Sequence, residues 1–161
     1  MKTLFTIIVL AFGLIVQAQD TIKLSDFESL NNTSWKGTLT YTDYQTGKLT
    51  DVDATMQFKI EDDKIITNVQ YTYEPSKNYK GSIKIKKKGT YFGNEKVLSF
   101  TNVNGTKTLV TTYRGKDDVR KADMYLTHVM TDSTYSVTKE VVYVDTEERL
   151  IRNTYNYIKI K

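Results

Sequence analysis

The chain has 161 residues, enough for one domain, with 23 Lys and Arg against 19 Asp and Glu, a mildly basic balance. It contains no cysteine, which excludes disulfides, and with only one histidine it offers no structural zinc site. No basic stripe interleaved with aromatic residues is present, so nothing in the sequence favours nucleic-acid binding.

The first residues have the pattern of a secretory signal. Lys2 precedes an apolar run from Leu4 to Val16, and Ala18 completes a small-residue cleavage pattern before Gln19. The apolar run of about 13 residues is shorter than the roughly 20 that span a bilayer. We therefore expect a signal peptide at residues 1–18, a single mature domain at 19–161, no transmembrane span, and a periplasmic or extracellular location.

Residues 20–31 are the helix candidate of the mature chain. Ile22, Leu24, Phe27 and Leu30 recur at roughly helical spacing, and Ser25 is a candidate cap for the following turn. We expect a short N-terminal helix that buries its apolar side against the rest of the domain.

From Ser34 onward, apolar and polar residues alternate with a period of two, which is typical of strands with one buried face. The connections are short and rich in Gly, Asn, Asp and Ser, and Asn104-Gly105 is the strongest hairpin signal. After the alternating segments near Trp35 and Phe58, further strands are expected at 65–74, 81–87, 96–103, 107–114, 122–130, 134–144 and 149–160.

These features predict an all-β fold, an antiparallel up-and-down meander of about 8–10 strands. Closure into a barrel removes the two open edges that such a meander would otherwise expose, so we expect a closed barrel. A two-layer sandwich is the alternative, although it usually needs longer loops. A membrane-embedded barrel is disfavoured because the polar faces carry charges such as Lys36, Asp53 and Lys59, which require water.

The layout resembles the lipocalin and fatty-acid-binding-protein group, the calycins. A short helical segment precedes a tryptophan at the start of the first long strand, here Trp35-Lys36-Gly37 where lipocalins have Gly-x-Trp. The resemblance implies a lipocalin-like barrel in which a late arginine packs on the tryptophan ring. Arg149 and Arg152 are the two candidates for this structural contact with Trp35.

The apolar strand faces are rich in tyrosine and methionine, and the chain has 12 tyrosines. Aromatic walls with a few directed hydroxyl groups suit a small-molecule site, although tyrosine is also an ordinary strand residue. His128 is interpreted either as a haem ligand or as a hydrogen-bonded core residue, and without a second ligand signal we expect no cofactor and no metal. The candidate ligand-binding residues are Tyr41, Met56, Phe58, Tyr71, Tyr73, Met124, Leu126, His128, Tyr143 and Tyr155.

We therefore expect an exported protein that binds a small, mostly apolar or aromatic molecule in a barrel cavity. One alternative is a non-catalytic envelope or secreted interaction module with a filled core. In that case the lysines at 84, 86, 87 and 88 would be a candidate contact surface, although such lysines usually form a solvated edge. A small barrel enzyme is a third hypothesis, but no catalytic motif supports it, and we expect no catalytic residues.

Overall fold

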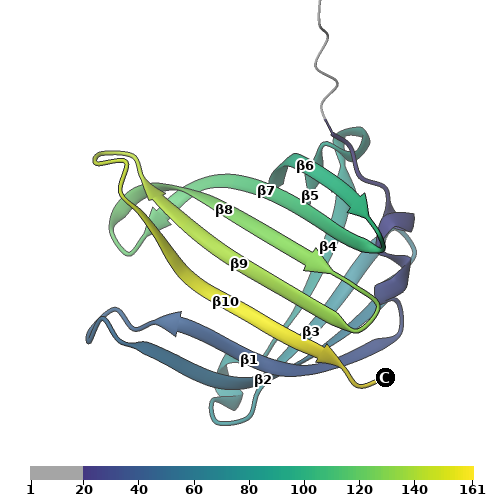
Figure 1. The fold of residues 1–161 in the computed structure, drawn as a ribbon, viewed down its shortest axis with the longest axis horizontal. Coiled ribbons are helices and arrows are strands. Elements are labelled where there is room, and N and C mark those ends of the chain that lie inside the picture. Colours follow the sequence, from purple (N-terminus) through teal and green to yellow (C-terminus); the bar gives the residue numbers. More distant parts are fainter. Residues whose placement is uncertain (1–19) are drawn as a thin grey trace, which may run out of the picture.

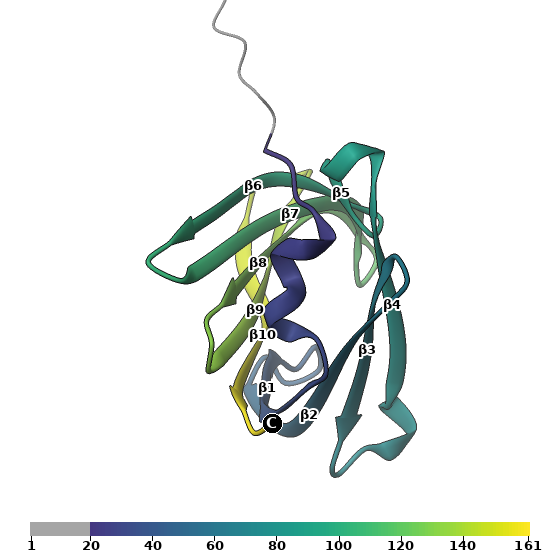
Figure 2. The same ribbon diagram turned by 90° about the vertical axis from the view of Figure 1, so that its right-hand side faces the viewer.

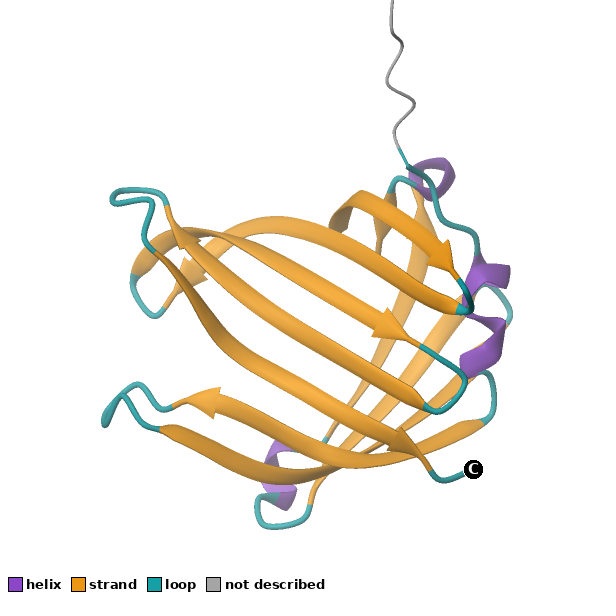
Figure 3. Cartoon of the chain, in the orientation of Figure 1, coloured by secondary structure: helices purple, strands orange, loops and turns teal. Residues whose placement is uncertain are grey.

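The computed structural model describes residues 20–161, so the expected signal peptide at 1–18 lies outside the described residues. Ten antiparallel strands follow one another around a closed barrel (Figures 1 and 3), which confirms the predicted fold class. Each strand pairs with its neighbours in sequence, and pairing of the first with the last closes the ring. The strands are β1 (Thr33–Thr42), β2 (Leu49–Glu61), β3 (Lys64–Tyr71), β4 (Tyr79–Lys86), β5 (Tyr91–Phe92), β6 (Glu95–Val103), β7 (Thr106–Asp117), β8 (Arg120–Met130), β9 (Thr134–Tyr143) and β10 (Arg149–Lys159).

The turns between strands have the backbone geometry that their residues favour. In the β6–β7 hairpin, Asn104 and Gly105 both have positive φ, 51° and 81°, as a primed two-residue turn requires. Asp62 in the β2–β3 turn and Asp118 in the β7–β8 turn also have positive φ, which aspartate tolerates better than most residues. Short turns of this kind fix the strand register and leave no room for a crossover connection. Two further turns are 3₁₀ helices, η2 (Pro75–Lys77) and η3 (Lys87–Gly89).

The predicted N-terminal helix is a 3₁₀ helix, η1 (Leu24–Leu30), and it lies across one end of the barrel (Figure 2). The helix begins at Leu24, so Ser25 lies within its first turn and is not its cap. The backbone N–H of Lys23 donates to Asp26 Oδ2 at 2.7 Å, so the Asp26 side chain satisfies a backbone donor at the helix start. Phe27 and Leu30 are buried beneath the helix. We call this the helix end of the barrel, and the other the opposite end.

The strand β5 joins the two halves of the barrel wall and was not predicted from the sequence. It has only two residues, with two residue pairs to β4 and two to β6. Most of β4 therefore pairs with β3 alone, since its contact with β5 involves only Ile85 and Lys86. This β5 seam is the narrowest pairing in the barrel.

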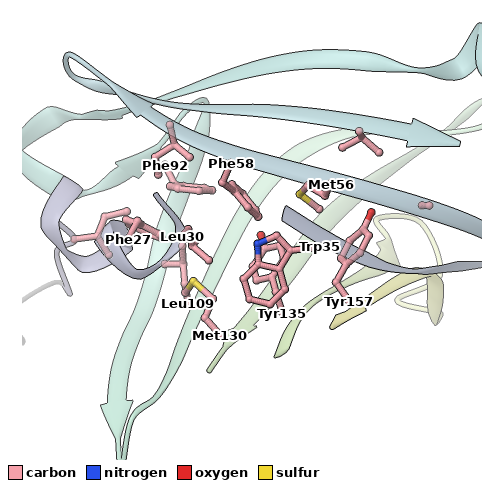
Figure 4. Close-up of a cluster of buried hydrophobic side chains, with 14 of the residues drawn as sticks. Phe27, Leu30, Trp35, Met56, Phe58, Phe92, Leu109, Met130, Tyr135 and Tyr157 are labelled. Atoms are coloured by element: carbon pink, nitrogen blue, oxygen red, sulfur yellow. The ribbon is translucent and has the colours of Figure 1, made fainter. Parts of the chain in front are cut away.

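The main core fills the helix end (Figure 4). Trp35 is 1% exposed, and its indole N–H donates to Thr33 Oγ1 at 2.7 Å, which satisfies the one polar group of the ring. Tyr135 packs edge-on to Phe58, with ring centroids 5.3 Å apart, and also contacts Trp35. A smaller cluster of Ala122, Met124, Val141 and Tyr143 packs separately.

The expected arginine contact with Trp35 is not formed. In the β1–β10 register Trp35 lies opposite Lys159, at the end of β10, and the Lys159 Nζ is 5.8 Å from the Trp35 ring centroid. Arg149 and Arg152 lie at the start of β10, and Arg149 forms a surface ion pair with Glu140. The prediction was wrong because the antiparallel pairing places both arginines at the far end of the barrel from the tryptophan.

Gly37 permits the close approach of β1 and β10. A Cβ at this position would lie 1.9 Å from the backbone oxygen of Asn156. Because the clashing atom belongs to the backbone, no side-chain movement can relieve the clash.

We expect Gly37→Ala to lower the free energy of unfolding by about 3 kcal/mol or more. Urea denaturation measures this. Gly47→Ala is the control, because Gly47 has open space around it and a φ of 67°, so its cost should be only about 1 kcal/mol. Equal costs would contradict the close-approach argument.

Candidate functional site

An inner cavity of about 330 Å³ occupies the lumen beneath the helix end. Its wall combines apolar side chains of η1, β2 and β3 with residues of β4, β8, β9 and β10. Such a lining of aliphatic and aromatic groups with few polar ones is typical of sites for small apolar molecules. The lining residues are Phe27, Leu30, Met56, Phe58, Ile65, Thr67, Val69, Tyr79, Gly81, Ser82, Ile83, Phe92, Leu126, His128, Met130, Tyr135, Val137 and Tyr155.

His128 is the main polar group of the inner cavity. Its Nδ1 lies 2.9 Å from the Tyr135 hydroxyl, and burial lowers the pKa of His128 to about 4, so the imidazole is neutral at pH 7. When the Tyr135 hydroxyl donates to Nδ1, Nε2 carries the ring proton. This Nε2 and the Tyr157 hydroxyl are buried and have no hydrogen-bond partner within residues 20–161. Of these two residues, His128 lines the inner cavity, whereas Tyr157 lines neither cavity.

A second, outer cavity of about 400 Å³ lies toward the opposite end. Its wall is more polar than that of the inner cavity and includes two lysines, an arginine and three tyrosines. The lining residues are Leu39, Tyr41, Thr42, Tyr44, Val52, Tyr71, Glu74, Lys77, Lys139, Arg152 and Asn153.

A pair of tyrosines separates the two cavities. Tyr71 lines the outer cavity, Tyr155 lines the inner one, and their hydroxyl oxygens are 2.7 Å apart. The cavities adjoin on β9 as well, where Val137 faces the inner cavity and Lys139 the outer, about 7 Å apart along the strand. A molecule that extends from one cavity to the other must therefore pass the Tyr71–Tyr155 pair, whose hydroxyl groups can bond to it.

A buried ion pair stands at the outer end of the lumen. The Arg152 guanidinium donates from Nε to Asp117 Oδ1 at 3.0 Å and from Nη2 to Oδ2. Tyr44 and Tyr143 each donate a hydroxyl hydrogen bond to Asp117 at 2.7 Å. Burial raises the pKa of Asp117, but the hydrogen bonds from Tyr44, Arg152 and Tyr143 outweigh this effect and lower the pKa below its ordinary value. The Arg152 guanidinium also lies 4.2 Å from the Tyr44 ring centroid, so the β1–β2 turn is fixed over the lumen.

Seven of the ten candidate ligand-binding residues line the two cavities. Met56, Phe58, Leu126, His128 and Tyr155 line the inner cavity, and Tyr41 and Tyr71 line the outer one.

The other three candidates lie elsewhere. Met124 and Tyr143 face inward but belong to the smaller core cluster, where packing encloses them. Tyr73 is 79% exposed, and its prediction as a lumen residue was wrong because β3 ends at Tyr71, so the strand alternation does not continue to it.

Several lining residues were missed. Lys139 lies on the inward face of β9 between Val137 and Val141, and the period-two alternation of that segment is the signal that places it there. Tyr79 also lines the inner cavity, although it precedes the expected start of its strand. Phe27 and Leu30 close the cavity from η1, and no local pattern could place that helix over the barrel end.

Within residues 20–161, no group of three or more His, Asp or Glu side chains is arranged to hold a metal ion. No helix in this part of the chain is long and apolar enough to cross a membrane.

The fold thus defines a ten-stranded antiparallel barrel with a partly open interior. No protein-family model matches the chain, and no curated protein matches its sequence. Among solved structures, the crystal structure of Rv2717c from M. tuberculosis is similar, with a TM-score of 0.61 and 12% sequence identity over 86% of this chain and 97% of that one. At this identity the likeness shows a shared fold alone.

The Asp117–Arg152 pair generates a stability prediction. Asp117→Asn leaves the Arg152 charge buried without its counter-ion, so we expect a loss of about 3 kcal/mol in the free energy of unfolding at pH 7. The control is Asp123→Asn, because Asp123 pairs with Arg114, which is 69% exposed, and such pairs contribute at most about 1 kcal/mol. Urea denaturation compares the two. Similar losses would contradict the assignment of a buried, coupled pair.

The low pKa of His128 generates a pH prediction. Because the folded pKa is about 4 against roughly 6.5 when unfolded, the unfolded chain binds a proton first as the pH falls. We expect stability to fall by about 3 kcal/mol between pH 7 and pH 4 from this group alone. His128→Gln should remove that part of the pH dependence in urea denaturation. A wild-type and a variant curve with the same slope between pH 6.5 and 4 would show that His128 is not buried as described.

Proposed function

We propose that this chain is an exported binding protein that holds a small, mostly apolar or aromatic molecule in the inner cavity. The observation that carries the proposal is the cavity itself: about 330 Å³ bounded by core side chains such as Met56, Phe58 and Leu126. Small barrels can be packed solid by their side chains, whereas the core here leaves room for a small molecule. A ligand in this space gains dispersion contacts with the side chains that line it.

The unpartnered Nε2 of His128 suits the same role. It needs a hydrogen-bond partner, and because His128 lines the inner cavity, a ligand with a polar atom among its rings can supply one. Specificity in such a site then comes from the few directed polar groups, and affinity from the apolar walls.

Export and a lipocalin-like relationship are part of the proposal. The pattern at Lys2, Leu4 to Val16 and Ala18 supports export. The short helix before a tryptophan-bearing first strand, followed by a closed meander, supports a lipocalin-like barrel. We propose binding without catalysis, because the inner cavity presents His128 and hydroxyl groups, and His128 is engaged with Tyr135.

The neutral fluorophore N-phenylnaphthylamine tests the proposal, since its emission rises and shifts to shorter wavelength in an apolar cavity. We expect saturable binding at one site. Val137→Phe places a ring in the inner cavity and should weaken binding roughly tenfold or more.

Val142→Phe is the matched control, because it makes the same chemical change on the same strand. Its neighbours Val141 and Tyr143 face inward, so the side chain at position 142 faces outward. It should leave the titration unchanged. A titration without saturation, or one weakened equally by both variants, would contradict binding in the inner cavity.

A further inference from the structure

Lys139 is a charged residue in the barrel interior. It lies on β9 between Val137, which lines the inner cavity, and Val141, which is fully buried in the smaller core cluster. The Lys139 side chain is half-buried and lines the outer cavity, close to where that cavity meets the inner one. An inward-facing lysine is unusual, because lysine is rarely buried without a partner.

Within residues 20–161, Lys139 Nζ has no hydrogen-bond acceptor and no carboxylate at ion-pair distance. The centroid of the Tyr113 ring lies 5.9 Å from Nζ. An ammonium group with three donors in this setting is free to bind an incoming anion.

The other charged groups around the lumen are already engaged or remote. Arg152 is bonded to Asp117 at the outer end. Glu74 and Lys77 are both exposed on the β3–β4 connection, at the rim of the outer cavity. Glu95 on β6 faces inward, and its Oε2 accepts a hydrogen bond from Thr111 Oγ1 at 2.6 Å. Burial raises the pKa of Glu95, while the Thr111 hydrogen bond and the charge of Lys139 lower it in part.

We propose that the ligand is an amphipathic anion whose apolar body occupies the inner cavity and whose carboxylate or sulfonate group binds Lys139. This inference rests on the proposed function, since it specifies the chemistry of the same ligand. Lys139 lies about 7 Å along β9 from Val137, so a molecule with an apolar body and one short polar end reaches from one cavity to the other. On its way past the Tyr71–Tyr155 pair, the anion can accept a hydroxyl hydrogen bond from either residue.

Glu95 then opposes the anion that Lys139 attracts. The two residues act on one another electrostatically, so the negative charge of Glu95 reduces the positive potential that Lys139 presents to the lumen. Removing each charge should therefore change the affinity for an anionic ligand in opposite directions.

Two fluorophores that differ by a single sulfonate provide the test: anilinonaphthalene sulfonate and the neutral N-phenylnaphthylamine. The measured quantity is the selectivity, the Kd of the neutral probe divided by the Kd of the anionic one. For the wild-type protein we expect selectivity above one. Lys139→Gln should lower it roughly tenfold, because a charge-assisted hydrogen bond is lost. Glu95→Gln, which keeps an amide oxygen for Thr111, should raise it severalfold.

Lys96→Gln is the control, because Lys96 is exposed, follows Glu95 directly and points away from the lumen. Its selectivity should equal that of the wild type. Saturable binding of the neutral probe, with a selectivity that Lys139→Gln does not lower or that Lys96→Gln lowers equally, would overturn the anion site and leave the proposed function intact. Failure of both probes to bind would overturn the proposed function itself.

Discussion

In a closed sheet, every second side chain of every strand must point into one shared interior. Ten strands enclose a lumen wider than the larger apolar side chains of this protein can fill from the wall alone. The helix end solves this by adding a lid: Phe27 and Leu30 enter from η1, and Phe27 stacks on Phe92 with centroids 5.2 Å apart. Beyond the core that forms there, the interior stays partly open, and the inner cavity is what remains.

The two ends of the barrel are stabilised by different physics. The helix end depends on apolar packing around Trp35 and Tyr135, whose few polar atoms are satisfied locally. The opposite end depends on Asp117, which gathers Arg152, Tyr44 and Tyr143 around one carboxylate. Polarity therefore increases along the lumen from His128 to Lys139 and Arg152. A gradient of this kind orients an amphipathic molecule, because each of its ends is stable in only one part of the interior.

The sequence predicts the repeating features well and the long-range ones poorly. Period-two alternation and turn residues such as Asn104-Gly105 are local, so strands, hairpins and the antiparallel order followed from them. Alternation also placed Met56, Phe58, Leu126 and Tyr155 on the lumen side. It failed at Tyr73, because the strand ends two residues earlier. The arginine contact with Trp35, which the lipocalin resemblance implied, is not formed because the β1–β10 pairing places Lys159 opposite Trp35. The two-residue strand β5 is too short for any periodicity to reveal.

The brevity of β5 has a kinetic consequence. Local opening of a sheet requires only the hydrogen bonds of the element that opens. Here the wall between β4 and β6 is held by two residue pairs on each side, together with the Gly93 N–H to Lys84 O and Val97 N–H to Thr90 O hydrogen bonds. Phe92 of β5 and Ile83 of β4 both line the inner cavity, so separation at this seam exposes the cavity through the side of the barrel. Exchange of the proposed ligand would then need neither displacement of η1 nor global unfolding. Residence time would be governed by how often a few backbone hydrogen bonds break, and binding strength by the walls that stay in place.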